Sequence, residues 1–263
     1  VQMIQKPFSV GVRIEHPQEL IDRAQYGTFA GHKLLGAADY ALVYHTPDKT
    51  RTAYSFCMCP GGFIVPAMTD TTQSVVNGMS PSGRNSAFAN SGLVTEVRLE
   101  DFAHLREQWG ELAGLRYQQL FEQLAREHSG DRQVAPAQRV SDFVYGRESR
   151  SLPRTSYIPG ITPSRLDKWM PEVIASRLRS GIATFGKRMR GFVTDEAIVV
   201  GVESRTSTPV RIPRDPETLM HSQVEGLFPA GEGAGYAGGI VSAALDGERI
   251  ADAVARYCKQ HNF

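Results

Sequence analysis

The first hundred residues carry short runs of apolar residues separated by polar positions, a pattern that predicts β-strands. Residues 8–16 mix β-branched and aromatic side chains and form the first predicted strand, after which Pro17 begins a short helical turn. Further strands are predicted at residues 40–45, 52–59, 63–68, 75–78 and 93–99, with a Ser- and Asn-rich loop at 80–90. Because the turns between residues 40 and 68 are so close together, these strands are expected to form an antiparallel meander.

The middle third has the periodicity of helices instead. Apolar residues recur at steps of three and four from Glu100 to Leu124, which predicts an amphipathic helix broken near Gly110 or Gly114. A second helix is predicted from Pro171 to Ile182, and the Pro- and Gly-containing residues 129–163 between the two are expected to be mostly loop.

Strands return in the last third, so the chain as a whole predicts an α+β (mixed α/β) fold. Residues 197–202 (AIVVGV) form a continuous apolar run, which is typical of a strand covered on both faces. Two shorter strands are predicted at 210–212 and 226–230, and the apolar spacing from Ile240 to Val254 predicts a closing helix.

A glycine-rich motif lies between the last predicted strand and this closing helix. It consists of Gly231, Glu232, Gly233, Ala234, Gly235, Tyr236, Ala237, Gly238, Gly239 and Ile240. Five glycines at such a junction leave backbone N–H groups open at the positive end of a helix, where an anion or an electron-rich carbonyl can bind. The alternative is that the glycines provide only clearance between helix and sheet. The motif lacks the Gly-Lys-Ser/Thr of a nucleoside triphosphate site, and no strand–helix–strand unit follows it.

Residues 226–247 (GLFPAGEGAGYAGGIVSAALDG) resemble the closing segment of FAD-dependent oxidoreductases, and most closely that of the bacterial, cytoplasmic NAD/FAD-utilizing dehydrogenases. Other segments that resemble this group are KPFSVGVRIEHPQELID (6–22), CMCPGGFIVPA (57–67), NGMS (77–80), RNSAFANSG (84–92), TSYIPG (155–160) and GVESRTSTPVRI (201–212). The resemblance implies that residues 231–240 contact FAD, with the closing helix pointing its N-terminus at the flavin ring. It also implies NADH or NADPH as a possible electron donor and an unidentified small-molecule substrate.

The resemblance further implies a division of the chain. Residues 1–212 would be an inserted substrate domain, β-rich to residue 99, helical from 100 to 190 and with strands from 191 to 212. Residues 213–263 would supply the C-terminal strand and helix of a Rossmann-like FAD-binding domain. The Gly-x-Gly-x-x-Gly fingerprint that opens such a domain is not found near Val1. We therefore expect the C-terminal half of a longer flavoprotein, whose partner is the N-terminal half and which alone binds FAD weakly or not at all and is inactive.

Three further candidates for chemistry are weaker. Cys57 and Cys59 lie one residue apart, so in a regular strand both thiols would share one face, as a redox pair or as packing residues. Glu203 and Arg205 follow a buried-type strand, where they either face a ligand crevice or form an ion pair or turn. Arg211 and Arg214 could contact a cofactor phosphate, although solvated arginines are the default. No spacing of Cys and His predicts a metal site.

Composition and charge narrow the remaining possibilities. With 41% hydrophobic and 22% charged residues, the 263-residue chain has the mixture of a globular protein. It has three cysteines, no apolar run long enough to span a membrane and no secretory signal, from which we expect a cytoplasmic location. The net charge of +1 argues against nucleic-acid binding by the whole chain. The basic residues between 147 and 190 nevertheless keep open a rival hypothesis, an RNA- or partner-binding module that retains the flavoprotein architecture.

Overall fold

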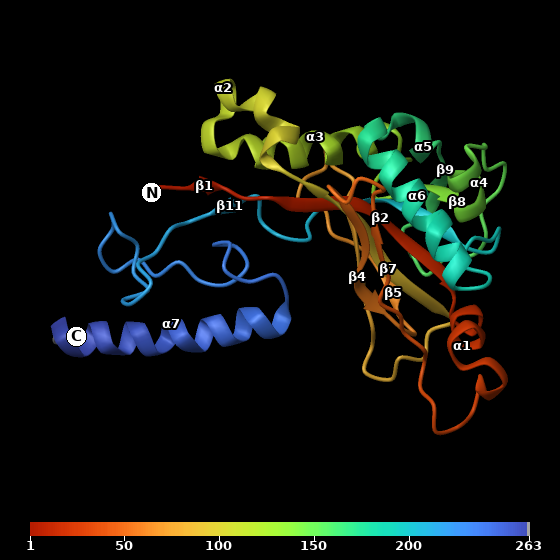
Figure 1. The fold of residues 1–263 in the computed structure, drawn as a ribbon, viewed down its shortest axis with the longest axis horizontal. Helices are drawn as coiled ribbons and strands as arrows, with labels where there is room; N and C mark the ends of the chain where they lie inside the picture. Colours follow the sequence, from red (N-terminus) through yellow and green to blue (C-terminus); the bar gives the residue numbers. More distant parts are fainter. Residues whose placement is uncertain (262–263) are drawn as a thin grey trace. The chain divides into compact units, whose positions relative to one another are not determined.

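The computed structural model describes residues 1–261 and shows the expected α+β fold, with a seven-stranded mixed sheet in the order β3-β4-β7-β2-β10-β8-β9 (Figure 1). The chain divides into two compact units. The sheet unit comprises residues 10–96 and 119–204, and the loop unit comprises residues 1–9, 97–118 and 205 onward. Because this division reflects contacts within the chain and not cofactor binding, it does not test the predicted boundary of an FAD-binding domain at residue 212, which stays a prediction.

The strands of the large sheet are β2 (Phe8–Pro17), β3 (Val43–His45), β4 (Thr52–Cys59), β7 (Phe88–Val97), β8 (Ala135–Arg139), β9 (Ile161–Pro163) and β10 (Ile198–Glu203). β8 and β9 pair in parallel, whereas β3–β4, β4–β7, β2–β10 and β10–β8 pair antiparallel. Every residue of β10 is buried, and so are the first nine of β2. These two strands are therefore covered on both faces, as the apolar run at 197–202 predicts.

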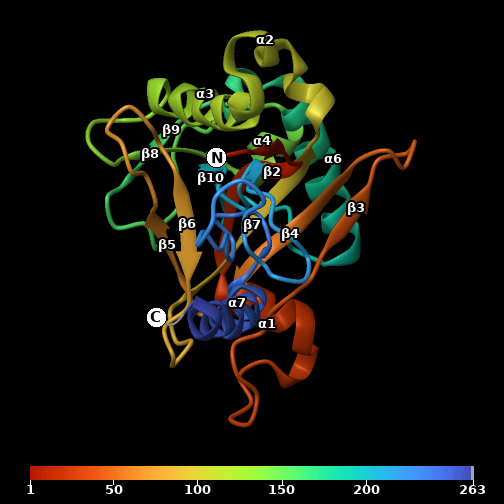
Figure 2. The same cartoon turned by 90° about the vertical axis from the view of Figure 1, so that its left-hand side faces the viewer.

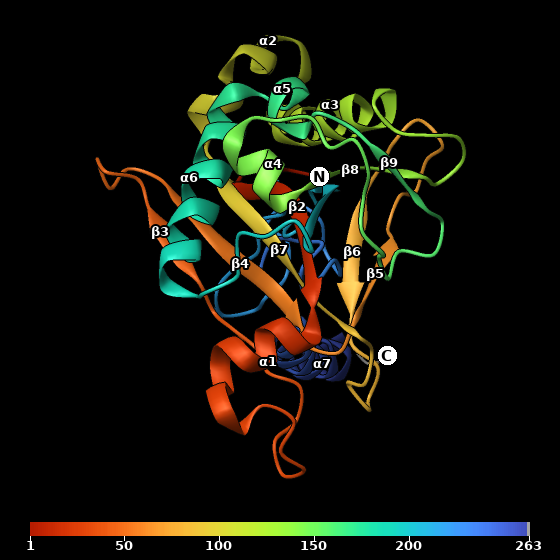
Figure 3. The same cartoon turned by 90° about the vertical axis from the view of Figure 1, so that its right-hand side faces the viewer.

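Different layers cover the two faces of this sheet. Along β2, Val12 and Ile14 point to one face and Arg13 and Glu15 to the other, and all four are buried. Helix α6 (Glu172–Arg188) packs on β3 and β4 (Figures 2 and 3), and α4 (Val140–Tyr145) and α5 (Leu166–Trp169) contact α6. A separate hairpin of β5 (Phe63–Pro66) and β6 (Val76–Met79) lies on the face of Arg13. Helix α1 (Gln18–Tyr26) and the 3-10 turn η1 (Gly27–Phe29) follow β2.

The loop unit has little regular sheet. Its strands β1 (Ile4–Gln5) and β11 (Val210–Arg211) form a two-stranded antiparallel ribbon. Its helical segments are η2 (Leu99–Leu105), α2 (Arg106–Trp109), η3 (Gly110–Leu112), the first turns of α3 (Ala113–Glu127), and α7 (Ile240–His261). The rings of Phe8, Phe102 and Tyr117 pack together, and Leu219, Ile250 and Ala253 form a second small core.

Most of the predicted elements are confirmed. The strands at 8–16, 52–59 and 197–202 correspond to β2, β4 and β10, and the predicted helices correspond to α3, α6 and α7. The break in the first helix is at Gly110, whose φ of 54° lies in the left-handed region that glycine tolerates. Strand β7 begins at Phe88, so the predicted loop at 80–90 is shorter than expected.

Two predictions about arrangement are wrong, and a third is incomplete. Residues 40–68 do not form one meander, because β4 pairs with β7 while β5 pairs with β6 in a separate hairpin. Residues 129–163 are mostly loop, as predicted, but they also contain β8, α4 and β9, which the sequence did not indicate; Pro136 lies in β8, which is buried beside β10. Residues 226–230 form no strand, because no segment within residues 1–261 pairs with them as a ladder and Pro229 has no N–H to donate.

Candidate functional site

A completely buried arginine organises the polar face of the large sheet. Arg13 on β2 has no exposed surface, and its guanidinium forms hydrogen bonds with groups from three other segments. Its Nε donates to Asn90 Oδ1 of β7 at 2.8 Å, Nη1 to Glu203 Oε1 of β10 at 3.2 Å, and Nη2 to the carbonyl of Cys57 at 2.7 Å. Nη2 also lies 3.1 Å from Cys59 Sγ. We call Arg13, Asn90, Glu203 and Cys59, with the Cys57 carbonyl, the Arg13 cluster.

Irregular strand pairing brings these groups together. The register between β4 and β7 shifts between Phe56 and Cys59, so Cys57 and Met58 lie in a bulge, where Cys57 has a φ of 43°. A second shift, between Gly201 and Glu203, occurs where β10 pairs with β2. The hairpin then closes over the cluster at Gly78, where an added Cβ would lie 2.1 Å from Arg13 Nη2. Such bulges re-aim individual groups, and here they direct a carbonyl and a carboxylate at one guanidinium.

Two polar atoms of the Arg13 cluster have no hydrogen-bond partner. Glu203 Oε2 and Asn90 Nδ2 are both buried and unpaired, although the other polar atom of each side chain binds Arg13. Burial raises the pKa of Glu203 to about 7, against the opposing effect of the Arg13 charge. A carboxyl with a pKa near neutrality can accept or donate a proton under ordinary conditions. The cluster therefore offers one donor and one proton-exchanging acceptor.

The two cysteines of the Cys-x-Cys pair lie in different environments. Cys57 is exposed and Cys59 is buried, so the expectation of two thiols on one face is wrong. The reason is the bulge, which interrupts the alternation of a regular strand. Burial raises the pKa of Cys59 even though the Arg13 charge acts in the other direction. Because the thiolate is the reactive form, these surroundings favour a packing role for Cys59.

The glycine motif in the loop unit has space around it. A Cβ added at Gly233, Gly238 or Gly239 would meet no atom within 4 Å, so clearance within the protein does not explain these three glycines. Gly231 and Gly235 have φ values of 66° and 85°, and a Cβ on Gly235 would meet the Val210 carbonyl at 2.7 Å. These two are required by the backbone. The other three lie in open space before and at the start of α7, and the first N–H groups of a helix have no partner within it.

An ion pair holds this motif in place. Arg214 Nη2 is 2.6 Å from Asp246 Oδ1, and Nη1 is 3.0 Å from Oδ2, with both side chains at least nine-tenths buried. Asp246 Oδ2 also accepts the Gly231 N–H at 2.8 Å, while the Arg214 guanidinium lies 3.7 Å from the Tyr236 ring centre. The Tyr236 hydroxyl accepts a hydrogen bond from the backbone N–H of Arg214 at 2.9 Å. We call Arg214, Asp246 and Tyr236 the loop clamp.

The structure separates the other arginines singled out from the sequence. Arg205 is half-buried and belongs to the loop unit, whereas Glu203 belongs to the sheet unit and pairs with Arg13. The predicted alternative of an ion pair at Glu203 is thus realised, with a partner that sequence spacing did not indicate. Arg214 is enclosed in the loop clamp, while Arg211 is exposed and donates through Nε to the Gly235 carbonyl at 3.2 Å.

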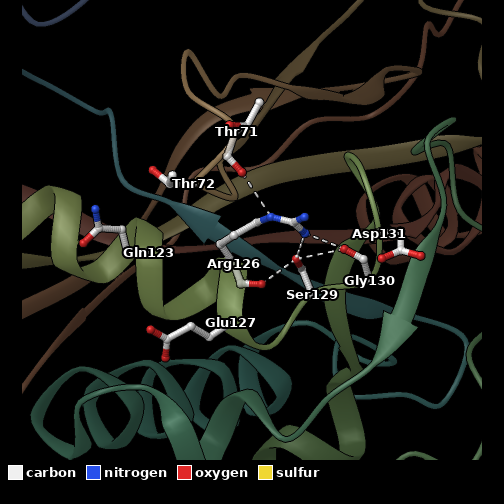
Figure 4. Close-up of a pocket in the computed structure, with 8 residues that line it drawn as sticks. All are labelled: Thr71, Thr72, Gln123, Arg126, Glu127, Ser129, Gly130 and Asp131. Carbon is white, nitrogen blue, oxygen red and sulfur yellow. Dashed lines mark hydrogen bonds between the residues drawn. The ribbon is translucent and has the colours of Figure 1, made fainter.

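A surface pocket of about 590 Å³ lies elsewhere in the sheet unit, around Arg126 (Figure 4). Its guanidinium donates to Thr71 O at 3.2 Å, Ser129 Oγ at 2.6 Å and the Gly130 carbonyl. These bonds tie the end of α3 to its neighbouring loops. Because Glu127 and Asp131 line the same pocket and offset the arginine charge, we do not assign it a ligand.

Several basic residues between 147 and 190 are engaged within the protein. Arg147 pairs with Asp142, Arg165 pairs with Asp167, and Arg188 donates to the Val43 carbonyl. Within residues 1–261, no three His, Cys, Asp or Glu side chains gather as metal ligands. In the same part of the chain, no helix is both long and apolar enough to cross a membrane.

Comparison with known families identifies the chain. The model of the family described as FAD-dependent protein, C-terminal domain-like, matches residues 7–206. The chain belongs to this family. An uncharacterized protein of Clostridium beijerinckii is 44% identical to it over 254 residues, which is 96% of this chain and 47% of that protein. The chain thus spans about half the length of this relative.

Membership in the FAD-dependent protein, C-terminal domain-like family supports an association with FAD at the level of the family. The family match includes the whole Arg13 cluster and ends before the glycine motif. The similarity to the clostridial protein covers 96% of the chain and so spans the motif as well. Contact of residues 231–240 with a flavin stays a prediction.

Sequence reasoning missed Arg13, Asn90 and Asp246, which are central to these two sites. Arg13 lies in a run predicted to be a strand. A charged residue at a position expected to be buried could have pointed to this site, since an unpaired buried charge is rare. Asp246 lies fifteen residues after Gly231, and nothing in the local spacing of residues links it to Arg214.

Proposed function

We propose that the chain is the C-terminal part of an FAD-dependent oxidoreductase, in which residues 231–240 line the flavin and the sheet unit serves as the substrate domain. The observation that carries the proposal is the open space around Gly233, Gly238 and Gly239 in a member of an FAD-dependent family. Glycines that pack against nothing at a helix N-terminus are suited to the close approach of a planar or anionic ligand.

The chain's own groups would act in two ways. The N-terminal end of α7 carries a partial positive charge, which would stabilise negative charge on a ligand bound there. The loop clamp keeps Gly231 and Tyr236 in place, so little reorganisation is needed on binding. In the sheet unit, Glu203 would hold or release a proton for a small-molecule substrate, with Arg13 stabilising its charged form. The hydride chemistry itself belongs to the flavin, and NADH or NADPH would be the electron donor.

The same proposal includes a partner, the N-terminal half of the flavoprotein. Two features of the loop unit support it. Residues 226–230 follow the order of a strand before a glycine turn but pair with no strand within residues 1–261. The first turns of α7 expose Ile240, Val241 and Leu245, with 91%, 73% and 57% of their surfaces accessible. An apolar face of this kind is typical of a surface that another domain covers. Without that half, the chain would bind FAD weakly and be inactive.

The test is an absorbance spectrum of the purified chain with added FAD, beside that of a longer protein that carries the upstream half. We expect a flavin spectrum from the longer protein and none from the chain alone after removal of excess FAD. Replacement of Gly239 by Val in the longer protein should then reduce flavin content, with Gly247→Val as the control on an exposed part of α7. A longer protein that retains no flavin would contradict the proposal.

The rival RNA-binding hypothesis makes the opposite prediction for the chain alone. Binding to RNA through several phosphates weakens steeply as salt increases, whereas this proposal expects no RNA binding at any salt concentration. A fluorescence titration with a labelled single-stranded RNA at two salt concentrations distinguishes the two.

A further inference from the structure

Two basic side chains lie on one face of the β1–β11 ribbon. The register pairs Ile4 with Arg211 and Gln5 with Val210, and the Lys6 N–H continues the ladder by donating to the Pro209 carbonyl at 2.9 Å. Residues directly opposite each other share a face, and so do residues two apart along a strand. Lys6 and Arg211 are therefore diagonal neighbours on the same face of the ribbon.

The Arg211 side chain contacts the glycine motif, while the Lys6 side chain is held at the segment before β11. Arg211 donates through Nε to the Gly235 carbonyl at 3.2 Å, and its guanidinium lies 5.1 Å from the centre of the Tyr236 ring. Lys6 Nζ donates to Ser207 Oγ at 3.3 Å and to the Thr208 carbonyl at 3.4 Å, which draws the ammonium group down onto the chain. The Arg211 guanidinium and the Lys6 ammonium group each retain N–H donors that these bonds do not use.

The electrostatics of this face are unbalanced. Burial and the nearby Arg211 charge lower the pKa of Lys6, against the opposing effect of the Glu232 charge. The carboxylate of Asp246 does not offset them, because it is bound by Arg214 in the loop clamp. Two like charges beside each other, one of them half-buried, are unfavourable unless an anion joins them.

We propose that Lys6 and Arg211 form an anion-binding site beside the glycine motif, for a phosphate-like or delocalised anionic group of a bound dinucleotide. The inference rests on the proposed function for the identity of the dinucleotide, though not for the site itself. Two anionic groups of a flavin dinucleotide fit this description, the pyrophosphate of FAD, with its charge on phosphate oxygens, and the reduced flavin, with its negative charge delocalised over the ring. Arginine and lysine bind both, the first through its planar fork and the second as a point charge.

The site is tested first on this chain with inorganic pyrophosphate, by calorimetric titration at low ionic strength. We expect weak saturable binding that is at least tenfold weaker in Lys6→Met and in Arg211→Met. It should be retained in Lys6→Arg and unchanged in the control Lys33→Met, which removes an exposed charge from the other unit. Circular dichroism melting confirms that each variant is folded. No binding to the original chain, or binding that is equal in the Met variants, overturns the proposal.

The second arm uses the longer protein and distinguishes the two groups. A tenfold loss of affinity for FAD but not for riboflavin, which lacks phosphate, identifies the pyrophosphate as the anion. A lower flavin reduction potential with either ligand identifies the reduced ring, because loss of nearby positive charge disfavours its anion. If the longer protein binds FAD and the Met variants change none of these quantities, the anion site is wrong while the proposed function stands. If it binds no flavin, the proposed function is wrong, and the pyrophosphate titration alone decides the site.

Discussion

The Arg13–Glu203 pair is an expensive arrangement for a protein to maintain at the centre of a sheet. Taking an ion pair out of water costs several kcal/mol per ion, and apolar residues of similar size would often be at least as stable. Here the cost is raised by two polar atoms without partners, Glu203 Oε2 and Asn90 Nδ2. Stability alone therefore gives no reason for this cluster, which agrees with its proposed role in chemistry.

The buried carboxyl predicts a specific dependence of stability on pH. Because the folded state raises the pKa of Glu203 from 4.5 to about 7, folded protein holds a proton in this range that the unfolded chain releases. The contribution of Glu203 to the free energy of unfolding should fall by about 3 kcal/mol as the pH rises from 4.5 to about 7. Glu203→Gln should lack this decrease, as measured by urea unfolding between pH 4 and 8.

A second buried group, His16, changes the pH dependence of stability in the opposite direction. The original protein must therefore be compared with the Glu203→Gln variant. Burial lowers the pKa of His16 from 6.5 to about 4, so its contribution is complete above pH 6.5 and is lost as pH falls. This effect is common to both proteins and cancels in the difference between them. A difference that does not change with pH would show that folding does not raise the pKa of Glu203.

The loop clamp predicts the effect of removing one charge near the glycine motif. Hydrogen bonding by Arg214 lowers the pKa of Asp246, so the carboxylate is charged at neutral pH. Asp246→Asn would leave Arg214 buried without a counterion, and should destabilise the loop unit by about 3 kcal/mol. Hydrogen exchange should be faster at the amides of Gly231 and Tyr236. The control Glu248→Gln removes an exposed charge from the same helix and should leave exchange unchanged.

At the scale of elements, the β5–β6 hairpin acts as a cover whose close fit depends on Gly78. A Cβ at this position would lie 2.1 Å from Arg13 Nη2 and 2.2 Å from Asn90 Oδ1, and neither side chain can move without losing hydrogen bonds. Gly78→Ala should therefore destabilise the protein by about 3 kcal/mol through overpacking. Gly83→Ala, where the nearest atom is 3.5 Å away, should be close to neutral. Equal unfolding midpoints for the two variants would contradict the close fit.

Elements with strong periodicity were the ones that the sequence could predict. β2, β4, β10 and the helices α6 and α7 follow from spacing alone, and Pro171 immediately precedes the first helical residue of α6. Strand pairing could not be predicted, because β4 and β7 meet across the separate β5–β6 hairpin. The bulges at Cys57 and before Glu203 leave no local signature, so the convergence of their groups on Arg13 was equally hidden.

For the molecule as a whole, the loop unit is where the proposed partner would have its effect. Its core around Leu219, Ile250 and Ala253 is small, and α7 exposes Ile240, Val241 and Leu245. We expect amides in the first turns of α7 to exchange faster in the chain alone than in the longer protein, because covered apolar surface opposes local opening. Mass-spectrometric hydrogen exchange measures both, with α6 as the internal reference. Equal exchange would contradict burial of this face by the upstream half.

The interleaved course of the chain has a consequence for how such proteins can be recombined. The loop unit takes its residues from 1–9, 97–118 and 205 onward, while the family match ends at residue 206. A chimera joined at residue 206 would place β1 from one parent against β11 from another, across the ladder that begins at Ile4 and Arg211. The glycine motif therefore cannot be transferred to another protein on its own. A functional chimera must take the N-terminal strand and residues 97–118 from the same parent as the motif.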